Sequence, residues 1–170
     1  MGTDINAAFG HGSEFPPTET LARSMCAGIK PVSPIFQNNW SLSDFSYLRL
    51  VRVHCSGLAI YFGPRAAIVS TGFSWPHTTA DHREAQMVAS AVSSIARFFR
   101  SPQVIFLPDD IEPWCDVDRW ISEGASIEEV RMRLAQIKGP ATGFSGTIKQ
   151  SPECWEVDGY FVEELSYDRA

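Results

Sequence analysis

Three short runs of residues that favour β-strands, separated by tight turns, constrain the fold of this chain more than any other feature. The runs are SYLRLVRVHC (46–55), GLAIYF (57–62) and AAIVS (66–70), and the turns between them contain Ser-Gly and Gly-Pro-Arg. Strands joined by such short turns pair with their neighbours in antiparallel fashion. The sequence therefore predicts an antiparallel meander over residues 46–70.

Two longer segments have the periodicity of amphipathic helices. Over residues 79–99, apolar residues recur at helical spacing and form one stripe: Val88, Ala91, Val92, Ile95 and Phe99. Over residues 126–138, Ser126 and Glu129 have the spacing of a capping box, and Gly139-Pro140 is a matching stop signal. The buried stripe of this second helix is predicted to comprise Ile127, Val130, Leu134 and Ile137.

Shorter elements complete the pattern. QVIFLP (103–108) reads as a buried strand, and DVDRWISEG (116–124) as a short helix. GTIK and CWEVDGYFVEEL near the C-terminus suggest further strands, with a hairpin turn at Asp158-Gly159. We predict an α+β fold, a single domain in which an antiparallel β meander or sheet packs against two or three helices.

The first 45 residues are rich in Pro, Gly, Ser and Asn. We therefore expect residues 1–45 to be an irregular N-terminal segment with one short helix near residues 18–27, and residues 46–170 to form the single α+β domain. GSEF at 12–15 is also a common expression-vector scar, so residues 1–15 are either native or vector-derived. A chain of 170 residues with 44% hydrophobic content is long enough to bury one core.

FSWPHTTADHRE (73–84) contains two of the four histidines and invites a metal site. Ligands on a helix must be three or four residues apart to share a face, whereas His77 and His82 are five apart. Asp81 and Glu84 suit the positive end of a helix dipole. The stretch is thus interpreted as a helix entry, and we predict neither a metal, a cofactor nor catalytic residues. The alternative is a small metal-dependent hydrolase centred on His77.

The sequence also argues against zinc binding, nucleic-acid binding, secretion and a membrane-spanning segment. The four cysteines have no close pair, so a zinc ribbon is not expected; free thiols are favoured, although two disulfides stay open. A net charge of −6 opposes nucleic-acid binding. No apolar run approaches eighteen residues and no secretory signal is visible, so we expect a cytoplasmic protein that does not span a membrane.

Charge is distributed unevenly along the chain. Residues 1–100 carry eight Lys/Arg and six Asp/Glu, whereas residues 101–170 carry six and fourteen. Acidic residues of the second part alternate with aromatic ones, a combination suited to steering and anchoring a basic protein partner. The predicted partner-binding residues are Asp109, Asp110, Glu112, Trp114, Asp116, Asp118, Glu156, Asp158 and Tyr160. A solvated rim with helix caps, and carboxylates paired for acid–base catalysis, are the alternatives.

The sequence favours a non-enzymatic protein that binds or inhibits another, basic protein. A bacterial immunity protein that neutralises a nuclease-like toxin is the type that best fits a small, acidic, aromatic-rich chain without a catalytic signature. No motif identifies a family, and the oligomeric state is left open.

Overall fold

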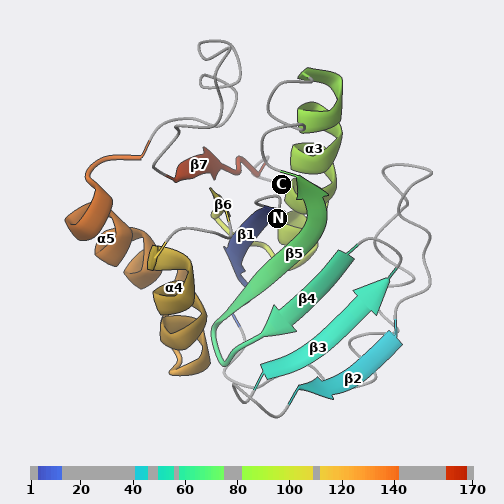
Figure 1. Ribbon diagram of the computed structural model, residues 1–170, viewed down its shortest axis with the longest axis horizontal. Coiled ribbons are helices and arrows are strands. Elements are labelled where there is room, and N and C mark those ends of the chain that lie inside the picture. The colour runs from blue at the N-terminus through green and yellow to red at the C-terminus, as the bar shows by residue number, and fades with distance from the viewer. Residues whose placement is uncertain are drawn as a thin grey trace.

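The structure is a computed structural model that describes residues 4–12, 41–45, 50–55, 58–74, 82–108, 112–141 and 160–167 (Figure 1). Its strands are β1 (Asp4–Gly10), β2 (Ser41–Phe45), β3 (Leu50–Cys55), β4 (Leu58–Phe62), β5 (Ala66–Ser74), β6 (Gln103–Pro108) and β7 (Phe161–Glu164). Its helices are α3 (His82–Phe98), α4 (Glu112–Ser122) and α5 (Ile127–Lys138).

The described strands form one sheet in the order β2-β3-β4-β5-β1-β6-β7, and every neighbouring pair is antiparallel. The predicted meander is confirmed as β3-β4-β5, and β2 extends it at one edge. The remaining strands join through β1, which pairs with β5 on one side and with β6 on the other. The N-terminal strand β1 thus lies inside the sheet, and the C-terminal strand β7 pairs with β6 at one edge.

The position of β1 corrects the prediction that residues 1–45 are irregular. Residues 4–10 form a central strand and residues 41–45 an edge strand. Ile5, Ala7 and Phe9 are fully buried on one face of the sheet, and Ala8 on the other. Because a central strand with both faces covered has no polar alternation, its sequence lacks the usual strand signal. The predicted helix at 18–27 lies outside the described residues.

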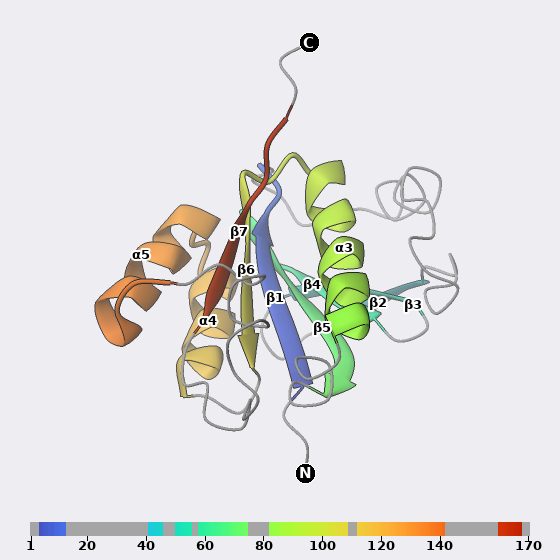
Figure 2. The ribbon, with the colours of Figure 1, turned by 90° about the horizontal axis from the view of Figure 1, so that it is seen from above.

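Helices cover both faces of the sheet (Figure 2). On one face, the predicted apolar stripe of α3 packs against β1, β4, β5 and β6, and Val88, Val92 and Ala96 are completely buried. On the other face, α4 and α5 pack through Val117, Ile121 and Leu134. The sheet is therefore the middle layer of three, with a separate hydrophobic core on each side.

Helix α5 confirms the predicted caps. The Glu129 N–H donates to Ser126 Oγ (3.2 Å), and the Ser126 N–H donates to the Glu129 carboxylate (2.7 Å). Gly139 caps the C-terminus. The prediction that Ile137 is buried is wrong, since 54% of this residue is exposed. Figure 2 shows the reason: the last turn of α5 lies farther from the strands than its first turn.

The fold is thus α+β in a single chain, as predicted. None of the helices in the described part is long and apolar enough to cross a membrane.

Candidate functional site

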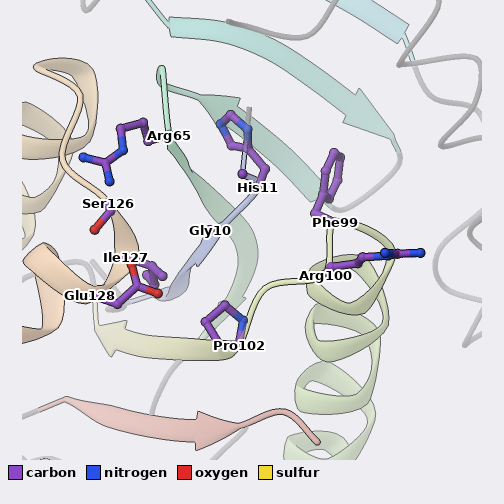
Figure 3. Close-up of a pocket in the computed structure, with 10 residues that line it drawn as sticks. Gly10, His11, Arg65, Phe99, Arg100, Pro102, Ser126, Ile127 and Glu128 are labelled. Atoms are coloured by element: carbon purple, nitrogen blue, oxygen red, sulfur yellow. The ribbon is translucent and has the colours of Figure 1, made fainter. Parts of the chain in front are cut away.

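A pocket of about 500 Å³ opens at the end of the sheet where β1 stops and β5 starts (Figure 3). Four parts of the chain contribute to it: the end of β1, the β4–β5 turn, the C-terminal end of α3 and the N-terminal end of α5. The lining residues are 10–12, 65, 99–100, 102 and 126–128. We call this the β1–α5 pocket.

His11 fixes the end of β1 to the β4–β5 turn. Its ring is buried, and Nε2–H donates to the Gly63 carbonyl (2.9 Å). The ring meets Phe62 edge-on at 5.7 Å between centroids. Burial lowers the pKa of His11 below its ordinary value, and backbone hydrogen bonds with Gly63 and Ala66 oppose that shift only in part. His11 is therefore a neutral structural histidine at pH 7 and brings no charge to the pocket.

Two close approaches hold the pocket walls together. The Gly10 N–H donates to Ser101 Oγ (2.9 Å), and Ser101 Oγ–H donates to the Gln103 carbonyl (2.6 Å). These bonds join β1 to the connection between α3 and β6. At Gly63, a Cβ would lie 2.3 Å from the Ile121 carbonyl oxygen, so only glycine permits the turn to contact α4.

The N-terminal end of α5 carries the acidic side of the pocket. Glu128 is exposed on the rim, and Glu129 is engaged by the capping box. The hydrogen bond from the Ser126 N–H, and then the Arg65 guanidinium at 3.3 Å, lower the pKa of Glu129. Both members of the Arg65–Glu129 pair are about half exposed, so this pair contributes little to stability.

Arg100 closes the opposite wall in an unusual backbone conformation. Its φ is 57°, and the Ser101 N–H donates to the Ala96 carbonyl while the Arg100 N–H donates to that of Arg97. This pattern is a Schellman motif, in which the left-handed position is usually glycine. An arginine in this position costs roughly 1–2 kcal/mol of backbone strain.

Three of the predicted partner-binding residues have described side chains, and they differ in environment. Asp116 is on the surface and pairs with Arg119 at 2.5 Å. Asp118 is partly buried; its Oδ1 has no hydrogen-bond partner among the described residues, and burial raises its pKa to about 6. Tyr160 is buried and its hydroxyl donates to the Gly139 carbonyl (3.0 Å). Tyr160, which precedes the core strand β7, is therefore not a surface group, and Asp118, which follows the core residue Val117 in α4, is only partly exposed.

Of the other predicted residues, Glu112 and Trp114 are in the first turn of α4, where the backbone alone is described. Asp109, Asp110, Glu156, Asp158 and the alternative site residue His77 lie outside the described residues. Within the described part of the chain, no three His, Cys, Asp or Glu residues gather as metal ligands would.

The β1–α5 pocket was not anticipated from the sequence. Its residues come from four distant segments, and only Arg65 and Ser126 belonged to a local signal, a predicted turn and a predicted helix cap. Comparison with protein-family models, curated proteins and solved structures gave no match to this chain. The fold and the pocket therefore define the chain only as an α+β protein with a mixed-charge pocket.

Proposed function

We propose that this chain is a non-enzymatic binding protein whose partner is a basic protein. A bacterial, cytoplasmic immunity protein that inhibits a nuclease-like toxin is the specific form of this proposal. Inhibition would follow from association with the acidic surface, which would cover cationic residues that the toxin needs to bind nucleic acid.

The observation that carries the proposal is the separation of charge across the sheet. The α3 layer, residues 82–100, has three arginines and one glutamate. The opposite layer, residues 112–141 together with Glu164 of β7, has seven Asp/Glu and four Lys/Arg, hence a net charge of −3. Glu163 of β7 lies on the α3 side, where it accepts a hydrogen bond from Ser93. The acidic half of the sequence thus contributes the layer of α4 and α5 and the β7 edge (Figure 2). A surface of one sign steers an oppositely charged protein toward it.

The start of α4 concentrates this charge. In the sequence, Asp109 and Asp110 precede the helix and are separated from it by Ile111; Glu112 is its first residue, and Trp114 follows within the first turn. Acidic residues at a helix N-terminus also stabilise the helix by about 0.3–1 kcal/mol each through the dipole. If these acidic residues only cap the helix, replacing them lowers the stability of the protein. If they bind the partner, replacing them lowers the association rate.

The test uses affinity capture of a partner from the source cell, followed by association kinetics over a salt series. The triple variant Asp109→Asn, Asp110→Asn, Glu112→Gln removes the charges and avoids placing lysines at the positive end of α4. We expect a lower on-rate at low salt that converges with the wild-type rate as salt screens the charges. Trp114→Ala should instead raise the off-rate.

The matched control is Glu84→Gln, which removes an acid from α3 on the opposite layer. It should leave both rates unchanged. Capture of an acidic partner, or equal on-rates for the triple variant and wild type at every salt concentration, would contradict the proposal. A triple variant that unfolds earlier but associates at the wild-type rate would assign these acids to helix capping alone.

A further inference from the structure

We propose that the β1–α5 pocket binds a small phosphate monoester on a hydroxyl-bearing carrier, such as a sugar phosphate or a nucleoside monophosphate. The pocket volume of about 500 Å³ falls within the range of roughly 300–1,000 Å³ typical of small-molecule sites. The pocket uses none of the residues at the start of α4 that are proposed to contact the basic partner. Glu128 belongs both to the pocket lining and to the acidic layer, but phosphate binding does not require that layer to bind a protein.

Arg65 is the group that would hold the phosphate. Figure 3 shows its guanidinium on the pocket wall, directed toward Ser126 at the start of α5. Its ion pair with Glu129 is long, at 3.3 Å, and solvent-exposed. A phosphate can take two parallel hydrogen bonds from one guanidinium, which is a stronger arrangement than this single contact. An incoming phosphate can therefore displace the Glu129 carboxylate from Arg65 without disrupting a buried pair.

Backbone donors lie beside Arg65. The N–H groups of Ser126 and Glu129 are used by the capping box. Those of Ile127 and Glu128, also in the pocket lining, donate to no acceptor among the described residues. The first-turn donors of a helix point outward along its axis and carry partial positive charge. They add to the positive potential that Arg65 creates at the start of α5.

The other residues that line the pocket determine which molecule can carry the phosphate. The Glu128 carboxylate lies on the same wall as Arg65 and can accept hydrogen bonds from hydroxyl groups (Figure 3). It also repels a ligand with several negative charges, so a monophosphate is favoured over a triphosphate. Phe99 and Pro102 form the apolar part of the pocket against which the carbon skeleton can rest. One phosphate together with several hydroxyls matches this set of groups.

The experiment is isothermal titration of the purified full chain with ribose 5-phosphate, AMP, ATP and ribose. We expect saturable binding of the two monophosphates, at least tenfold weaker binding of ATP than of AMP, and none of ribose. Arg65→Gln should weaken ribose 5-phosphate binding at least tenfold. Glu129→Gln should strengthen it severalfold, because glutamine keeps the capping box but no longer competes for Arg65.

The matched control is Arg131→Gln. Arg131 also lies on the α5 layer and is partly exposed, but its guanidinium donates to Gln103 and Glu164 and does not line the pocket. This variant should bind like the wild type. Circular dichroism and thermal melting verify that each variant is folded. Absence of saturable binding of both monophosphates at millimolar concentration overturns the proposal, as does equal weakening by Arg65→Gln and Arg131→Gln, or ribose that binds as well as its phosphate.

Discussion

Replacement of Asp118 by asparagine should stabilise this protein, and the gain should depend on pH. Asp118 is in α4, next to the core residue Val117, and its Oδ1 is buried without a hydrogen-bond partner in the part of the chain that the structure describes. Burial raises the pKa of its carboxyl from 3.8 to about 6, since the charged form is poorly solvated. One pKa unit corresponds to about 1.4 kcal/mol, so the ionised carboxylate costs up to about 3 kcal/mol at neutral pH.

The direction in which stability changes with pH follows from the number of protons that the folded and unfolded chains bind. Between pH 4 and pH 6 the folded chain holds more protons at Asp118 than the unfolded chain does, so stability falls as pH rises through this window and is constant above it. Asparagine removes the charge. We therefore expect Asp118→Asn to change stability little at pH 4 and to gain about 1–3 kcal/mol at pH 7, the lower end allowing for an amide that also lacks a partner.

Urea denaturation of both proteins at intervals from pH 4 to pH 8 measures this difference. The control is Asp116→Asn on the same helix, which removes an exposed carboxylate paired with Arg119 and should change stability by less than about 1 kcal/mol. A gain for Asp118→Asn of equal size at pH 4 and pH 7 would refute the assignment to a buried charge. So would a loss of stability at pH 7.

Four further substitutions test the packing and the backbone conformation, each by chemical denaturation. Leu134→Ala should cost about 2–5 kcal/mol because this residue is fully buried in the α5 stripe, whereas Ile137→Ala should cost far less; similar losses would place both in the core. Gly63→Ala should cost about 1–3 kcal/mol or more, since its Cβ would collide with the backbone of Ile121; a neutral result would mean that the turn and α4 can separate. Arg100→Gly should stabilise by about 1 kcal/mol by relieving the left-handed strain, and a loss would indicate that the arginine side chain offsets it.

Local patterns predicted those parts of the fold that local interactions determine. The α3 stripe and the α5 capping box could be read directly, because residues three or four apart on a helix share a face and a cap involves neighbours in sequence. The meander was also predictable, since short turns leave adjacent strands few alternatives to antiparallel pairing.

The rest of the fold depends on contacts between distant segments. Residues 4–10 contain small and apolar side chains without alternation, and nothing in them indicates that β5 and β6 will cover both edges. The β1–α5 pocket has the same origin: Gly12, Arg65 and Ser126 come together only after β1 enters the sheet and α5 crosses its end. Asp118 follows Val117 in a helix, and whether such a boundary position meets water or protein is decided by the neighbouring layers.

Helix α4 separates the two proposed sites. Its C-terminal end contacts the β4–β5 turn through Ile121 and Gly63, and that turn supplies Arg65 to the pocket. Its N-terminal end carries Glu112, which precedes Ile121 by nine residues and lies roughly 14 Å from it at about 1.5 Å per residue. This distance exceeds the Debye length of about 8 Å at physiological salt, so charge at one site has little influence on the other. A phosphate ester in the pocket should thus leave the on-rate of a basic partner unchanged, unless α4 itself moves when either ligand binds.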